Sequence, residues 1–268
     1  VSCGPNLILN PSFELTTPDC GVSGRNILHT DRSPISNWYG LSCSTCANNG
    51  STPDNYNSTC AGTNSTSNCG DGNGSVGIFT TLARESVQAK LTSPLKAGHL
   101  YCFSMKVKSD GFTQSDGIGA WLHNKGKLDV DSDNNGDQYL GAGTKINANP
   151  QVQNTPGNMI GSACKTVSGT FCAQGGESWI VLSNFKKDTD TKVSGSGFLD
   201  AGYLIVDELS LTEINCLTIS SITSGADSVC PGSCTTLAVN PAGGNGSYTY
   251  IWLPGGEKTK SINACPAT

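Results

Sequence analysis

The sequence has little charge, and its charges are spread out. Charged residues make up 14% of the 268 residues, the formal net charge is −5, and no basic cluster is longer than Lys186-Lys187. Proteins that bind nucleic acid or anionic membranes carry dense basic patches, because Lys and Arg neutralise phosphate groups. The charge pattern therefore argues against nucleic acid and anionic membranes as partners.

Long apolar runs are missing as well. No stretch approaches the roughly 20 apolar residues that span a bilayer. No charged and apolar leader precedes Val1. We therefore expect no membrane insertion, and we expect the numbering to begin at a mature, processed end.

Residues typical of catalytic sites are scarce. The three histidines are His29, His99 and His123; none belongs to a metal-ligand pair, and the chain has no G-x-S-x-G elbow. A carboxylate pair for glycoside hydrolysis stays open, because its separation is a three-dimensional quantity. We expect a protein that is not an enzyme, with a polysaccharide hydrolase as the weakest alternative.

Cysteine, in contrast, is abundant. The chain has 13 cysteines and 33 glycines, and thiols at this density persist as disulfides only outside the reducing cytoplasm. We therefore predict a secreted protein, extracellular or on a cell surface. The odd count leaves one thiol over, which points to a partner beyond the last residue or on another molecule. The C-x-x-C motif Cys43 to Cys46 lies in a polar, cysteine-rich segment, so a disulfide staple is favoured over zinc or redox chemistry.

Connectivity cannot be read from the sequence, since eight cysteines alone allow about 105 pairings. Cys3 comes just before the first apolar run, and Cys216 follows the strand-like residues 203–215. If those two elements pair as first and last strands of one domain, Cys3 and Cys216 can bridge its base. We expect disulfides to include four further cysteines: Cys102, Cys172, Cys234 and Cys265.

Helical periodicity is absent over any useful window, and short alternating segments take its place. In residues 99–109, Tyr101, Phe103, Met105 and Val107 alternate with polar or small residues, so one face belongs to a core and the other to solvent. Other strands are expected at 6–15, 75–82, 116–124, 164–175, 177–185 and 202–211. Two antiparallel sheets packed face to face are the economical arrangement. We predict an all-β protein, with a jelly-roll β-sandwich over residues 1–215.

The sequence pattern changes after Cys216. Short strands are separated by Gly and Pro turns, and Tyr248, Tyr250 and Trp252 share one face. This pattern is typical of an immunoglobulin-like sandwich, but such a fold needs roughly 100 residues. We therefore expect residues 216–268 to form an incomplete immunoglobulin-like domain with Trp252 in its core.

Several strand-edge phrases carry a family resemblance. NLILNPSFE at the start, the pair Arg84-Glu85, GGESWIVLSNF and YLIVDELSL together resemble the N-terminal module of large bacterial surface proteins exported by the type IX secretion route. That module is similar to carbohydrate-binding jelly rolls. The tail VCPGSCTTLAVNPAGGNGSYTYIWLPGG resembles the repeated PKD-like or immunoglobulin-like domains of the same proteins. The resemblance implies this fold, export and a glycan as ligand.

One segment has the spacing of a calcium loop. Its oxygen-bearing side chains are Asp129, Asp131, Asp133, Asn135 and Asp137. This spacing, with glycine at the sharp turn, wraps oxygen ligands around Ca²⁺. However, alanine stands where an EF-hand supplies a bidentate Glu, and no helices flank the loop. A structural Ca²⁺ site and a solvated acidic turn stay open as alternatives.

The resemblance implies a second structural Ca²⁺ between the first and last strands, with Glu14 and Asp207 as the matching carboxylates. The alternative is that Glu14 satisfies backbone amides and Asp207 caps a turn.

For ligand binding, the alternation in 116–124 points Trp121 away from the core, with His123 beside it. A flat exposed ring can stack on the apolar face of a sugar, and His123 can add a hydrogen bond. The alternative is that the long insertion downstream covers Trp121. We expect Trp38 and Trp179 to fill the core.

Our leading hypothesis is a secreted, non-catalytic module for adhesion or glycan binding, whose partner is a glycan or another cell-surface ligand. The rival is a structural subunit of an extracellular filament, a homopolymer formed when the open edge of the second domain accepts a strand from a neighbouring chain.

Overall fold

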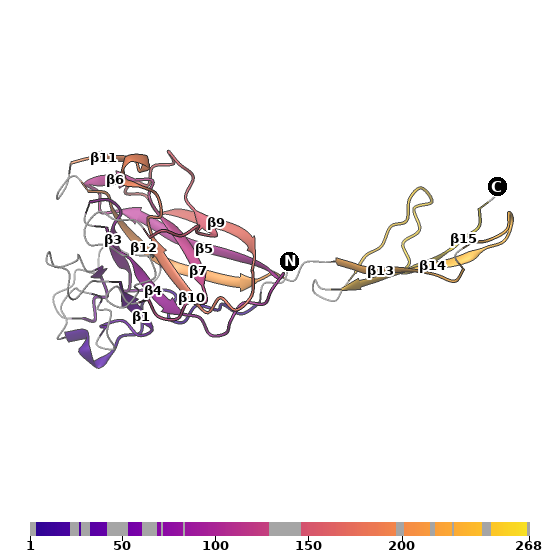
Figure 1. The fold of residues 1–268 in the computed structure, drawn as a ribbon, viewed down its shortest axis with the longest axis horizontal. Coiled ribbons are helices and arrows are strands. Elements are labelled where there is room, and N and C mark those ends of the chain that lie inside the picture. The colour runs from indigo at the N-terminus through magenta and orange to yellow at the C-terminus, as the bar shows by residue number, and fades with distance from the viewer. Residues whose placement is uncertain are drawn as a thin grey trace. The chain divides into compact units, whose positions relative to one another are not determined.

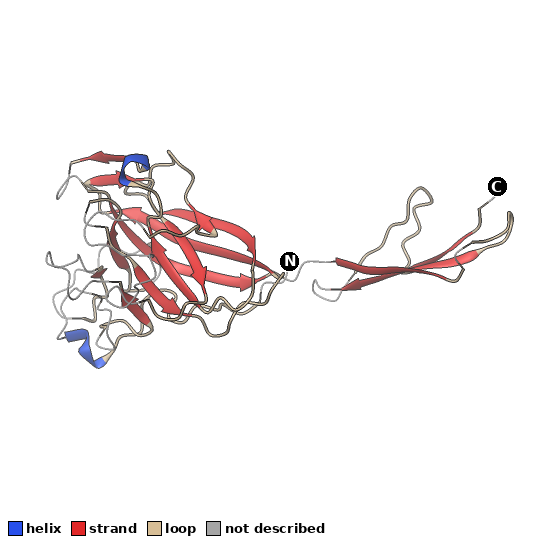
Figure 2. Ribbon diagram, viewed as in Figure 1, coloured by secondary structure: helices blue, strands red, loops and turns tan. Residues whose placement is uncertain are grey.

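The structure is a computed structural model of the chain. It describes residues 4–21, 27, 33–41, 53–60, 69–70, 72–82, 84–128, 146–196, 201–214, 218–226, 228–242 and 248–266. Strands are the main regular structure among these residues, and the helices among them are two short 3₁₀ turns, Pro18–Gly21 and Asp188–Asp190 (Figure 2). The expected all-β fold class is confirmed. The chain divides into a larger unit, Pro5–Thr212, and a smaller unit made of Val1–Gly4 and Glu213–Thr268.

Two five-stranded sheets form the larger unit, as the expected jelly-roll sandwich requires (Figure 1). Sheet I has the order β1 (Trp38–Gly40), β4 (Val87–Lys90), β10 (Trp179–Ser183), β7 (Gly119–His123) and β8 (Val152–Gln153). Sheet II has the order β2 (Asp54–Asn55), β3 (Val76–Phe79), β12 (Tyr203–Glu213), β5 (Leu100–Ser109) and β9 (Lys165–Cys172). A separate ribbon pairs β6 (Thr113–Ser115) with β11 (Val193–Gly195). All strand pairs whose register is described are antiparallel.

The core lies between the two sheets. One cluster of buried side chains includes Ala89, Leu122 and Ile180 from sheet I and Phe103 and Leu204 from sheet II. Burial of this apolar surface is the main stabilising term for a sandwich. Each strand therefore has one face in the core and one outer face.

The bulge in β12 shows how this alternation is adjusted. Leu204 and Val206 lie in the core, and so do Leu209 and Leu211. Val206 and Leu209 are three residues apart, so strict alternation would place them on opposite faces. Glu208 absorbs the extra residue with a φ of 44°. A bulge of this kind re-aims the strand without ending its pairing.

Residues 6–15 differ from our expectation of a first strand. The backbone N–H of Leu7 donates to the carbonyl of Leu211 at 2.8 Å, but the segment then turns. Asn10 and Phe13 have φ values of 51° and 58°, which no extended strand adopts. The apolar residues of this segment reach the core from a turn.

Three disulfides are described, and they join Cys20 to Cys60, Cys69 to Cys164 and Cys234 to Cys265. The last is one of the cysteine pairs that we expected to be oxidised. The proposed bridge between Cys3 and Cys216 lies outside the described residues, and so does the Cys43 to Cys46 motif.

Cys102, Cys172 and Cys230 are free thiols in the structure. This differs from the disulfides that we expected at Cys102 and Cys172. The register of β5 and β9 places Cys102 opposite Thr170, so Cys102 and Cys172 are diagonal neighbours, whose typical Cα separation is slightly longer than a disulfide spans.

The smaller unit contains one antiparallel sheet in the order β13 (Thr218–Ser224), β14 (Thr235–Ala242) and β15 (Ser261–Ala264). No second sheet is present among the residues described for this unit. Trp252 is half-buried, and its indole N–H donates to the carbonyl of Thr259 at 2.8 Å.

Candidate functional site

The outer face of sheet I carries a row of side chains that crosses four strands. The register makes neighbours of Tyr39 in β1, Gln88 in β4, Val181 in β10 and Trp121 in β7. Their sequence neighbours Ala89, Ile180 and Leu122 face the core. The strand alternation therefore turns this whole row outward.

A second row lies beside the first. Lys90, Trp179 and His123 are neighbours across β4, β10 and β7. Trp179 is half-buried, so it does not fill the core as we expected. The error has a simple cause: Ile180 and Leu182 point inward, and the alternation turns Trp179 outward. Trp38, in contrast, is fully buried at 0% exposure.

Two pairs of rings lie on this face. The rings of Trp121 and His123 stack with their centroids 4.4 Å apart and an interplanar angle of 28°. The rings of Tyr39 and Trp179 are 6.3 Å apart and tilted by 49°. Tyr39, Trp121 and Trp179 are each half-buried. We call these three side chains and His123 the aromatic face.

Two lysines accompany the rings. The ammonium of Lys127 lies 4.0 Å from the ring centroid of Tyr39. That of Lys125 lies 5.8 Å from the ring centroid of Trp121. Both distances are in the range of cation–π attraction, which orients the side chains across the rings. The aromatic face thus combines apolar rings with ammonium groups that lie over two of them.

The insertion after β7 covers one part of the outer face. The side chain of Gln88 accepts a hydrogen bond from the Leu128 amide and donates one to the Leu128 carbonyl, both at 2.8 Å. Leu128 and Trp121 pack against a small apolar cluster that contains Val181 and Phe185. The Trp121 ring therefore faces outward, and the described start of the insertion packs against the same apolar cluster as this ring.

His123 is the least exposed member of the aromatic face, at 4%. Its Nδ1 accepts a hydrogen bond from the Lys125 amide at 3.3 Å, so the proton of the neutral ring belongs on Nε2. Among the described residues, Nε2 has no hydrogen-bond partner. Burial, helped by the charge of Lys125, lowers the pKa of His123 to about 4. At neutral pH the face therefore presents a neutral imidazole.

Glu14 and Asp207, the carboxylates implied for calcium, are engaged by backbone amides. The Glu14 carboxylate accepts hydrogen bonds from the amides of Asn73 and Gly74, each at 2.8 Å. Asp207 accepts from the amides of Cys69 at 3.1 Å and Glu208 at 2.7 Å. Both carboxylates therefore have backbone amide partners in the structure.

No group of three or more His, Cys, Asp or Glu side chains in the described part of the chain could hold a metal ion. The segment from Asp129 to Asp137 lies outside the described residues. Structural Ca²⁺ at either place stays a prediction.

Two buried groups should change the stability of the larger unit in opposite directions as the pH falls. Asp207 is fully buried, and burial, together with the charges of Glu208 and Glu14, raises its pKa to about 6. Between about pH 6 and 4 the folded state therefore binds a proton at Asp207 that the unfolded state binds only near pH 3.8, so this group stabilises the fold as the pH falls. His123 acts the other way, because the unfolded chain binds its proton near pH 6.5 and the folded state only near pH 4.

We expect His123→Gln to lose less unfolding free energy than the wild type between pH 7 and pH 4.5, by roughly 1–3 kcal/mol. Asp207→Asn, the matched variant, should lose more than the wild type over the same range. Urea unfolding at both pH values measures the difference. Identical pH profiles for His123→Gln and the wild type would contradict the burial of a neutral imidazole.

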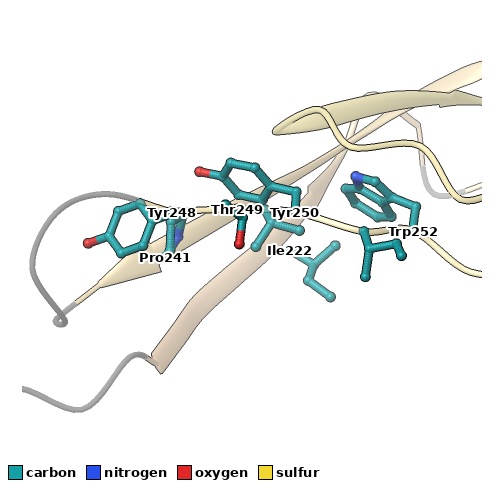
Figure 3. A pocket seen from close by; sticks show the side chains of 8 residues that line it. Ile222, Pro241, Tyr248, Thr249, Tyr250 and Trp252 are labelled. Carbon is teal, nitrogen blue, oxygen red and sulfur yellow. The ribbon is translucent and has the colours of Figure 1, made fainter. Parts of the chain in front are cut away.

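A second candidate site lies in the smaller unit. A pocket of about 390 Å³ is lined by the side chains of Ile222, Val239, Pro241, Tyr248, Thr249, Tyr250, Ile251 and Trp252 (Figure 3). The extended segment 248–252 runs over β13 and β14, and its tyrosines and Trp252 are half-buried. This pocket is apolar, and it lies in a unit whose one described sheet has no partner sheet.

Alternation within 116–124 pointed to Trp121 and His123, whereas Tyr39, Trp179 and Lys127 were not predicted for this face. Alternation within 177–185 could have identified Trp179. No local sequence pattern indicated Tyr39, because it comes close to Trp179 only through the pairing of β1, β4 and β10.

No protein-family model matches the chain. No curated protein matches it either. Similar solved structures are found at low identity. The enzymatically active domain of tailspike protein 4 from bacteriophage CBA120 is 13% identical with a TM-score of 0.40, over 78% of this chain and 21% of that one, so the chain spans about a fifth of its length.

Two other solved structures are matched over nearly their whole length. The K1 cleaved adhesin domain of Lys-gingipain from Porphyromonas gingivalis W83 is 12% identical with a TM-score of 0.39, over 78% of this chain and 98% of that one. The CBM22-1 xylan-binding domain of Paenibacillus barcinonensis Xyn10C is 12% identical with a TM-score of 0.38, over 80% and 97%.

Proposed function

We propose that the larger unit is a non-catalytic extracellular module that binds a glycan on the aromatic face of sheet I. The observation that carries this proposal is the presence of three half-exposed rings, Tyr39, Trp121 and Trp179, on one sheet face. A pyranose has an apolar C–H face that lies flat on an aromatic ring, and burial of both surfaces favours binding. Adhesion to a surface glycan would use the same contact.

The arrangement is held in place before a ligand arrives. The rings project from strands, which place side chains more reproducibly than loops. Gln88 fixes the start of the insertion beside them through its two hydrogen bonds to Leu128. Lys125 and Lys127 bring N–H donors to the aromatic face, and sugar hydroxyls can accept hydrogen bonds from them.

Three described disulfides support an extracellular location, because such bonds persist in oxidising compartments. The residues that the structure covers include no helix with the length and apolarity needed to cross a membrane. Export by the type IX route stays a prediction.

Removing a ring should remove binding. We expect Trp121→Ala and Trp179→Ala each to weaken the affinity for a bound polysaccharide at least tenfold, or about 1.4 kcal/mol, because each deletes an apolar platform at the centre of the face. A glycan array identifies the polysaccharide, and isothermal titration calorimetry measures the affinity of each variant.

Phe112→Ala is the matched control, since Phe112 is an aromatic side chain that is 71% exposed in the turn before β6 and outside sheet I. It should bind like the wild type. Equal losses of affinity in all three variants, or no loss in the two tryptophan variants, would contradict binding at the aromatic face. Release of reducing sugar from the bound polysaccharide by pure protein would make the molecule an enzyme and contradict the non-catalytic part.

A second candidate function is self-association through the smaller unit, as in a filament. It is favoured by exposed apolar side chains there, since Ile222, Ile251 and Leu253 are 62%, 65% and 81% exposed. Contiguous apolar surface and unpaired strand edges tend to be covered by another chain. Sedimentation velocity decides: oligomers that disappear in Ile251→Lys combined with Leu253→Lys support this function, and a monomer at all concentrations excludes it.

A further inference from the structure

Strand β9 is the outermost strand of sheet II, and in the described part of the sheet it pairs only with β5. An edge strand is held by hydrogen bonds on one side and is the easiest strand to displace. Its N-terminal end is fixed covalently, because Cys164 immediately precedes Lys165, the first residue of β9, and is bonded to Cys69.

The other end of β9 carries an unbonded cysteine. Cys172 is the last residue of the strand, and its Cα partner on β5 is Leu100. Two residues along β5, Cys102 is the partner of Thr170. Because alternate residues share a face, Cys102 and Cys172 are diagonal neighbours on the same side of the sheet.

That side is the solvent side. The sequence neighbours of Cys102 on β5, Tyr101 and Phe103, point into the core. Cys172 is exposed and Cys102 is half-buried, and both are free thiols. A small oxidant can therefore reach Cys172 first, with Cys102 next to it.

The separation suits a bridge after a small shift. Diagonal neighbours in an antiparallel pair lie about 7–8 Å apart at Cα and closer at Cβ, while disulfides span up to about 6.8 Å. A movement of roughly 1 Å closes the difference. The edge strand can make this movement, since no further strand is described on its outer side.

We propose that Cys102 and Cys172 form a reactive thiol pair that closes into a cross-strand disulfide, with a low-molecular-weight disulfide such as oxidised glutathione as the oxidant. The thiolate of Cys172 attacks one glutathione sulfur and releases the first glutathione as a thiolate. The thiolate of Cys102 then attacks the Cys172 sulfur and releases the second. Two electrons pass to the oxidant, and the two protons lost by the cysteines end on the released glutathiones.

The consequence is a strand anchored at both ends, by Cys164 to Cys69 and by Cys172 to Cys102. Opening this bond frees one end of the edge strand without touching the core. The inference does not depend on glycan binding, because sheet I carries the aromatic face and sheet II carries the thiols.

Cys230 supplies an internal control. It is an exposed free thiol in the smaller unit, and Cys234, the nearest cysteine along the chain, is already bonded to Cys265. Cys230 should therefore stop at the mixed disulfide with glutathione, whereas the proposed pair should pass through it.

The test treats the full chain with oxidised glutathione and maps its peptides without reduction. We expect a cross-linked peptide that contains Cys102 and Cys172 without glutathione, together with glutathionylated Cys230. In Cys102→Ser, Cys172 should retain its glutathione. Oxidation should also raise the thermal midpoint of the wild type by several degrees and leave that of Cys102→Ser unchanged.

Two results overturn the proposal. One is a stable mixed disulfide at Cys172 in the wild type, and the other is full alkylation of both thiols after exposure to the oxidant. Isolation of the protein with the bond already closed supports it, provided that reduced glutathione opens that bond.

Discussion

Replacing both Cys69 and Cys164 by serine is expected to lower the unfolding free energy of the larger unit by roughly 4 kcal/mol. The two cysteines are 95 residues apart in sequence, and a cross-link that closes so long a loop removes much of the entropy of the unfolded chain. The bond also holds Cys69 where its amide donates to the buried carboxylate of Asp207. Loss of the bond therefore weakens both the end of β9 and the segment packed over β12.

Guanidinium unfolding followed by circular dichroism measures this loss. The matched control is the double serine variant of Cys234 and Cys265, a disulfide with a separation of 31 residues in the smaller unit. That variant should leave the transition of the larger unit in place. A loss below about 1 kcal/mol for the Cys69 and Cys164 variant would show that the bridge is not part of the native fold.

Trp38→Ala should destabilise the larger unit by about 3–5 kcal/mol. The indole is fully buried, its ring lies 4.8 Å from that of Phe13, and its N–H donates to the Asn10 carbonyl at 2.9 Å. Truncation leaves a cavity and removes one of two hydrogen bonds to the Asn10 carbonyl, which also accepts from the Phe13 amide at 3.2 Å, in the turn where Asn10 and Phe13 have positive φ. The effect combines lost packing with loss of the anchor that holds this turn against β1.

Trp38→Phe separates the two contributions, because it keeps most of the apolar volume and removes only the donor. Its loss should be smaller, about 1–2 kcal/mol, in the same denaturant titration. Equal losses for the alanine and phenylalanine variants would assign the whole effect to the hydrogen bond. A neutral alanine variant would contradict the place of Trp38 in the core.

Strands with a clear period of two were predictable from the sequence. Residues 99–109 alternate strictly, and β5 has the expected burial, with Tyr101, Phe103, Met105 and Val107 inside. The same rule turned Trp121 outward. Binary alternation works here because one face of the strand is buried in the core and the other is not.

Where both faces are covered, the pattern is ambiguous. The run from Trp179 to Ser183 is apolar on both sides, since Val181 packs under the insertion while Ile180 lies in the core. We therefore placed Trp179 on the wrong side. A continuous apolar run does not indicate which of its side chains face the core and which face outward.

Long-range pairing and backbone turns were also out of reach. Tyr39 and Trp179 lie on one face because β1 and β10 both pair with β4, in registers that turn these two side chains to the same side of the sheet. The positive φ values of Asn10 and Phe13 depend on tertiary contacts with Trp38. No local propensity specifies either feature.

The place of the ligand can be observed directly through the indole N–H signals of the four tryptophans in an NMR titration with the bound polysaccharide. Trp121 and Trp179 belong to the aromatic face, whereas Trp38 is buried in the core and Trp252 belongs to the smaller unit. Our account predicts that the signals of Trp121 and Trp179 shift together with one dissociation constant and that those of Trp38 and Trp252 stay in place. Shifts confined to Trp252, or none at Trp121 and Trp179 in the presence of binding, would contradict it.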